Sequence, residues 1–135
     1  MAIFSKLGDY RNFALLVMRV GIGCMMVLHG YPKMLGGPEK WEKIGHAVSL
    51  AGIDGYFTFW GFMAAFAEAI GGILLVLGFL FRPAALLLLI TMIVASMKHL
   101  DGGDGISGAS HAVELAFVFL GMFILGPGKY SIDKS

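Results

Sequence analysis

Two charged side chains stand inside long apolar runs of the sequence. Arg19 interrupts the run 12–29, and Glu68 is the single charge in the run 57–81. A charge near the centre of a bilayer costs about 2.5–3.5 kcal/mol on insertion scales, so such a residue usually faces the protein interior and has a partner. The simplest expectation is that Arg19 pairs with Glu68. The pair would be either a structural ion pair or a proton or ligand site centred on Glu68.

Three histidines and a second carboxylate form another candidate group at the ends of the apolar runs. His29 ends the first run, His99 ends the third, and His111 opens the fourth with Glu114 one helical turn further on. Together with Glu68 they would form a polar track that descends from the membrane surface. Such a track suits a quinone head group, a proton relay or a metal ion. In the alternative, the histidines lie in the headgroup region and bond only to water or backbone.

Metal and phosphate chemistry find little support in the sequence. His111 and Glu114 form a lone His-x-x-Glu pair, and no H-E-x-x-H or paired E-x-x-H motif occurs. We therefore predict no metal centre, and a metal ion or haem is less favoured than a quinone as a cofactor. The glycine pair 102–103 lacks the following Lys-Ser/Thr of a phosphate loop, and no Ser-His-Asp arrangement can be read. No catalytic residue is assigned.

The composition places these side chains in a membrane. The chain has 135 residues, of which 58% are hydrophobic and only 14% are charged, whereas an ordinary soluble domain is about 25% charged. So few charges cannot cover the wet surface of a soluble domain of this size. A net charge of +1 gives no basic patch for nucleic acid. The lone Cys24 cannot form an internal disulfide. The lipid bilayer is therefore the expected partner.

Four apolar segments can cross the bilayer, because a spanning helix takes about 20 residues. They lie at about 12–30, 57–81, 83–99 and 106–125. The break at Arg82-Pro83 is so short that its flanking helices must be antiparallel neighbours, and Gly126-Pro127-Gly128 ends the last helix. The predicted fold is all-α. It is a single domain over 1–135, a four-helix transmembrane bundle with a long, partly helical loop between its first two spans.

The loop between the first two spans has a helical pattern of its own. Within residues 38–49, Trp41, Ile44 and Val48 share one face. The segment is too short and too charged to span, so we expect it at the outer membrane interface with Trp41 as its anchor. A slight excess of Lys and Arg on the side of the two termini predicts that both are cytoplasmic. The histidines then lie on the outer side.

Small residues flank both charges in the spans. In the first span, one helical stripe contains Arg19, Gly23, Met26 and Gly30. In the second span, one row contains Ala64, Glu68 and Gly72, and another contains Gly61, Ala65 and Ala69. Small residues let helix backbones approach closely in a membrane, where apolar contact alone gives little drive for association. We therefore expect the charged faces to be the close-packing faces, with Arg19 and Glu68 buried inside the protein.

Several segments, in this order, resemble the DoxX family of small four-helix bacterial integral membrane proteins. They are Arg19…His29-Gly30-Tyr31-Pro32-Lys33, then Glu68-Ala-Ile-Gly71-Gly72 with Gly78 and Arg82, and finally Gly126-Pro127-Gly128-Lys129-Tyr130-Ser131-Ile132-Asp133. The resemblance implies a bacterial plasma (inner) membrane protein in which Arg19, His29, Lys33, Glu68, Gly71, Gly72 and Arg82 match recurrent positions. It brings no settled catalytic residue. The family takes its name from a subunit linked to archaeal quinone-reducing sulfur oxidation, and several members are thought to accompany redox enzymes or stress-response systems.

The resemblance and the polar track together favour a redox-associated accessory subunit that interacts with a quinone. The track would hold the head group or pass protons, Arg19 would tune Glu68, and the partner would be a membrane or peripheral redox enzyme. Two alternatives stay open. One is a non-enzymatic scaffold or interaction module. The other is a small transporter, which would need a homo-oligomer because four helices make a poor pore. Whether the chain is an enzyme is left open.

Overall fold

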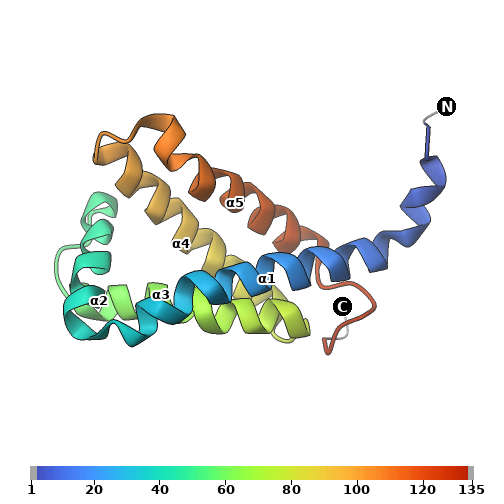
Figure 1. The fold of residues 1–135 in the computed structure, drawn as a ribbon, viewed down its shortest axis with the longest axis horizontal. Helices are drawn as coiled ribbons and strands as arrows, with labels where there is room; N and C mark the ends of the chain where they lie inside the picture. The colour runs from blue at the N-terminus through green and yellow to red at the C-terminus, as the bar shows by residue number, and fades with distance from the viewer. Residues whose placement is uncertain (1–2, 134–135) are drawn as a thin grey trace.

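The computed structural model describes residues 3–133, which contain helices and turns and no strand (Figure 1). The four long helices are α1 (Arg11–Leu35), α3 (Phe57–Leu77), α4 (Phe81–Asp101) and α5 (Gly105–Leu125). A short 3-10 helix, η1 (Ser5–Tyr10), precedes α1. Each long helix is apolar and long enough to cross a membrane. The predicted all-α, four-helix transmembrane fold is confirmed.

Glycine and proline set the helix ends that differ from the expected spans. α3 ends at Leu77, before the expected limit of 81, because Gly78 adopts a left-handed conformation with φ 67°. Glycine is the residue that takes this conformation at little cost. α1 continues past 30 to Leu35 with Pro32 inside its last turns. That extension carries Lys33 on the helix itself, where the sequence had suggested a loop.

The connection between the first two long helices contains α2 (Gly37–Gly45) and the 3-10 helix η2 (His46–Ala51). α2 lies on α3 at very short range, because Gly45 and Gly61 face the backbones of Phe57 and Trp41 with no room for a Cβ atom. The Trp41 indole donates a hydrogen bond to the Lys33 carbonyl oxygen at 2.9 Å. Trp41 is thus half-buried and bonded within the protein, and its expected position at the membrane interface stays a prediction.

The long helices pack mainly in two pairs, α1 with α3 and α4 with α5. Figure 1 shows the α4–α5 pair diverging from the α1–α3 pair towards the end of the molecule where α2 lies. We call that end, with α2, η2 and the α4–α5 turn, the loop end. The opposite end, with the start of α1, the α3–α4 turn and residues 126–133, is called the terminal end.

The small-residue faces do join α1 to α3. Arg19, Gly23, Met26 and Gly30 are all buried, as their stripe predicted. Gly30 faces the backbone of Glu68 and Ala69, and Gly23 faces Gly72, in each case too closely for a side chain. The apolar core comes chiefly from α4 and α5, and its largest members are Phe81, Leu88, Met92, Phe119 and Met122, joined by Met26 and Leu75.

Candidate functional site

Arg19 is a structural joint at the terminal end, with only 1% of its surface exposed. Its Nε and Nη2 atoms donate to the carbonyl oxygens of Leu75 and Val76 at 3.0 and 2.9 Å. Its Nη1 atom donates to the carbonyl oxygens of Pro127 and Tyr130 at 3.0 and 2.7 Å. The last carbonyls of a helix lack intrahelical donors. Arg19 therefore caps the end of α3 and ties the C-terminal segment to it.

The C-terminal segment completes this joint. The Asp133 carboxylate accepts hydrogen bonds from the backbone N–H groups of Leu80 and Phe81, at 3.0 and 2.8 Å, where α4 begins. A Cβ atom on Gly78 would meet the Arg19 guanidinium and the Ser131 side chain. The terminal end is thus filled by mutually satisfied groups, and every bond described there serves the fold.

Glu68 pairs with Lys33, so the expected pair with Arg19 is wrong. Lys33 Nζ lies 3.0 and 2.8 Å from the two carboxylate oxygens. The Glu68 side chain is 5% exposed and that of Lys33 is 34% exposed. Arg19 meets α3 at Leu75, seven residues beyond Glu68, which is about 10 Å further along the helix. The expectation failed because α1 is longer than predicted and brings a second cation to the carboxylate.

The Lys33–Glu68 pair lines a cavity of about 280 Å³ that lies between α2, η2, α3 and α4. Most of the wall is apolar. The polar side chains in it are Lys33, Trp60, Glu68, Thr91, Lys98 and His99. Thr91 already donates its hydroxyl to the Leu87 carbonyl oxygen at 2.8 Å. Apolar walls with a few convergent polar groups are typical of small-molecule sites.

Trp60 lines this cavity and carries a polar atom without a partner. Its Nε1 atom is buried and has no hydrogen-bond partner among the described residues. An indole N–H can only donate, and a buried donor without an acceptor costs about 1–3 kcal/mol. Sequence reasoning did not single out Trp60. The signal was present, because the row Ala64, Glu68, Gly72 reaches Trp60 when it is extended back by one turn.

The structure divides the expected polar track. Only His99 shares the cavity with Glu68, and its Nδ1 atom lies 2.9 Å from Asp104 Oδ2. The rings of His29 and His111 contact each other across α1 and α5, with centroids 5.3 Å apart, and neither lines this cavity. Glu114 is exposed and lies outside the cavity wall as well. Within residues 3–133, no three His, Cys, Asp or Glu side chains are grouped so as to hold a metal ion.

Comparison with known proteins places this arrangement in a family. The DoxX family model matches residues 14–99, which include Arg19, Lys33, Trp60 and Glu68. The chain belongs to the DoxX family. Two relatives are "Uncharacterized membrane protein Rv3486" of Mycobacterium tuberculosis, 30% identical over 90% of this chain and 80% of the relative, and "Inner membrane protein YphA" of Escherichia coli K12, 29% identical over 97% and 96%. No solved structure matches the chain.

The residues that carried the DoxX resemblance now separate by role. Arg19, Gly78 and the C-terminal segment build the terminal end, and Gly72 brings α3 against α1. Arg82 Nε donates to the Phe123 carbonyl oxygen at 3.1 Å and so holds the end of α5. Of the residues that carried the resemblance, only Lys33 and Glu68 line the cavity beside Glu68. The chain is thus a multi-pass membrane protein whose recurrent positions mostly serve the fold.

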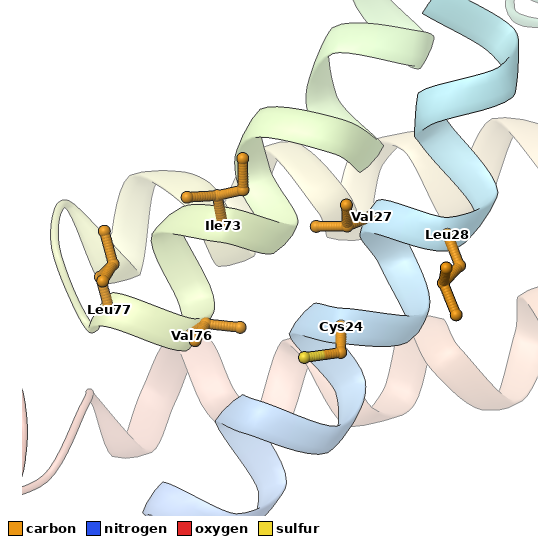
Figure 2. Close-up of a pocket in the computed structure, with 6 residues that line it drawn as sticks. All are labelled: Cys24, Val27, Leu28, Ile73, Val76 and Leu77. Atoms are coloured by element: carbon orange, nitrogen blue, oxygen red, sulfur yellow. The ribbon is translucent and has the colours of Figure 1, made fainter.

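A second cavity of this DoxX protein lacks the means to orient a ligand. It has a volume of about 390 Å³ and lies between α1 and α3 (Figure 2). Its lining is apolar apart from the Cys24 thiol, and consists of Cys24, Val27, Leu28, Ile73, Val76 and Leu77. In Figure 2, Cys24 of α1 points towards Val76 of α3. Such a groove suits disordered lipid chains, so the cavity beside Glu68 is the candidate site.

Proposed function

We propose that this DoxX protein is a redox-associated accessory subunit that binds a quinone head group in the cavity beside Glu68. The observation that carries the proposal is that Trp60 lines this cavity and that its buried indole N–H has no acceptor among the described residues. A quinone is a flat, apolar ring whose carbonyl oxygens accept hydrogen bonds. A carbonyl oxygen of the ring would give the indole the acceptor that it lacks.

The other polar groups of the cavity fit the same ligand. An ammonium has three donors, and the two bonds from Lys33 to Glu68 leave one for a ligand. His99 and Lys98 add donors at the loop end. The volume of about 280 Å³ is just below the range of about 300–1,000 Å³ for ligand pockets. That size favours a single ring over a large cofactor.

Each residue has a defined task in this proposal. Glu68 fixes the Lys33 ammonium at the cavity wall, and Trp60 orients the ring through one hydrogen bond. Apolar side chains of α3 and α4 exclude water. The bound quinone would supply the electron-carrying chemistry, and a separate membrane or peripheral enzyme would exchange electrons with it. We place the protein in the bacterial inner membrane with both termini cytoplasmic, so that the loop end faces outwards.

A binding experiment tests the proposal. Purified protein in nanodiscs is titrated with a naphthoquinone and a benzoquinone that lack side chains, and bound quinone is measured by equilibrium dialysis. We expect saturable binding of at least one of them. Trp60→Phe keeps the ring but removes the donor, and should weaken binding about fivefold to tenfold, since a hydrogen bond contributes about 1 kcal/mol. Phe117→Leu, on the exposed surface of α5, is the matched control. If neither quinone binds saturably, the proposal is refuted.

The scaffold alternative has one observation in its favour. The outward face of α2 is charged and exposed, with Glu39, Lys40, Glu42 and Lys43 available to a partner. If docking on this face is the function, reversing these charges abolishes activity in cells, and Trp60→Phe leaves it unchanged. The quinone proposal predicts the opposite pattern.

A further inference from the structure

We infer that His29 and His111 form a binding site for a divalent cation of the zinc or copper type, held between α1 and α5. The two rings meet across these helices. They lie outside the cavity beside Glu68, so binding of the cation is independent of the quinone proposal. Local motifs could not reveal this pair, because its members lie on the first and the last of the long helices.

The two imidazoles reach from one helix pair to the other. α1 packs on α3 and α5 packs on α4, whereas the described backbones of α1 and α5 do not pack against each other. Figure 1 shows the two pairs diverging towards the loop end. His29 and His111 each lie six residues from the loop-end terminus of their helix, which places both about 9 Å inside it. Two side chains at the same level thus join helices whose backbones are apart.

The ring nitrogens of this pair lack partners inside the protein. Among residues 3–133, no hydrogen bond or ion pair joins either ring to another group, whereas His46 and His99 each have a carboxylate beside them. His29 and His111 are exposed on helices that are long and apolar enough to cross the membrane. An ionisable side chain in a membrane span is costly without a partner and points to a functional site. A cation bound between the rings satisfies one nitrogen of each.

The separation of the rings fits a shared cation. Imidazole nitrogens bind zinc at about 2.0–2.1 Å in tetrahedral geometry, which places the centroids of two ligating rings about 5 Å apart. The observed separation is 5.3 Å. The ring planes are inclined by 54°, so the rings do not stack face to face. Each ring can turn about its broad χ2 torsion to direct a nitrogen at the cation.

The donor set selects the class of cation. Neutral imidazole suits zinc, copper and nickel, whereas calcium and magnesium prefer oxygen ligands. No described carboxylate or thiol completes a group of three with this pair, so water fills the remaining positions. Two protein ligands are fewer than the three or four of catalytic and structural zinc sites, so the cation binds reversibly. While bound, it ties α1 to α5 and fixes the separation of the two helix pairs.

Titration with the metal alone tests the site. The full chain, free of any polyhistidine tag, is placed in nanodiscs of zwitterionic lipid and titrated with Zn²⁺ by calorimetry. We expect one equivalent to bind, and His29→Gln or His111→Gln to weaken binding at least about tenfold. The double variant should bind little worse than either single variant, because one imidazole alone holds the cation poorly. His46→Gln is the matched control, since it removes another exposed histidine, and it should change the affinity less than about twofold.

A second measurement needs no variant. Pulsed electron paramagnetic resonance of Cu²⁺ bound to the wild-type protein distinguishes one coordinated imidazole from two, and two are expected. If the wild type and the double variant bind Zn²⁺ equally, or if Cu²⁺ has fewer than two imidazole ligands, the site is refuted. If His46→Gln weakens binding as much as His29→Gln does, the cation lies elsewhere and the inference is wrong as well. Quinone binding is unaffected by any of these outcomes.

Discussion

Among residues 3–133, the two buried charges lie at different levels of the α1–α3 seam, and their surroundings differ sharply. Arg19, at the terminal end, donates four hydrogen bonds to backbone carbonyl oxygens and is fully enclosed. Glu68, nearer the loop end, pairs with a lysine that is one-third exposed, in the wall of a cavity. A charge in a membrane span is therefore not in itself a functional site. The state of its neighbours distinguishes a structural charge from a ligand site.

The largest effect is expected at the terminal end. Arg19→Met leaves the four carbonyl oxygens without their donor, and hydrogen bonds to charged groups contribute about 1.5–3 kcal/mol each. We expect the free energy of unfolding in detergent to fall by more than about 3 kcal/mol. Arg19→Lys keeps some of the donors, so its free energy of unfolding should fall by less. If Arg19→Met is as stable as the wild type, Arg19 does not have the structural role assigned to it.

The Lys33–Glu68 pair should respond asymmetrically. Lys33→Met leaves a carboxylate that is only 5% exposed without a partner, whereas Glu68→Gln leaves a lysine that can reach water. Removing one partner from a buried pair costs more when the remaining charge is the buried one. We expect Lys33→Met to lower stability by about 1–2 kcal/mol more than Glu68→Gln. The double variant Lys33→Met with Glu68→Gln should recover part of the loss. Thermal unfolding of the three variants measures this, and equal losses in both single variants would contradict it.

Gly78 sharpens the structural reading of the terminal end. Gly78→Ala places a side chain at φ 67° and against the Arg19 guanidinium. A strained conformation of this kind costs about 1–3 kcal/mol. Gly21→Ala is the matched control, because nothing surrounds the added methyl group there and alanine favours a helix. We expect Gly78→Ala to lower the unfolding temperature and Gly21→Ala to leave it unchanged or raise it. If Gly21→Ala lowers the unfolding temperature more than Gly78→Ala does, Gly78 is not needed for the packing around Arg19.

The smallest effects should separate the two groups of histidines. His111→Phe keeps a ring against His29 and lies outside the cavity, so stability should change by less than about 0.5 kcal/mol and quinone binding should be unaffected. His99→Phe removes a polar group from the cavity wall and should weaken binding about twofold to threefold. Equilibrium dialysis of both variants makes the comparison. If His111→Phe weakens quinone binding, His111 and His99 belong to one polar track, as the sequence predicted.

Only some residues of the candidate site could be predicted from the sequence. Glu68 and His99 were identified because charge and imidazole are conspicuous in or beside an apolar run. Lys33 appeared only through the family resemblance, since a proline at 32 made the helix seem to end before it. Trp60 was overlooked because a tryptophan in a membrane span is ordinary in composition. Its significance comes from a donor without an acceptor, which is a property of the surroundings and not of the residue.

Composition and periodicity by themselves determined that the chain is a four-helix membrane protein and that small residues bring α1 against α3. They could do so because burying apolar surface and satisfying backbone groups in lipid leave few solutions. Only the tertiary structure decided which cation meets Glu68, since that depends on where α1 ends and how far a side chain reaches. It also decided that Arg19 binds carbonyl oxygens 56 and 108 residues away along the chain. Hydrogen-bond partners so distant in sequence are fixed by packing, which no local pattern records.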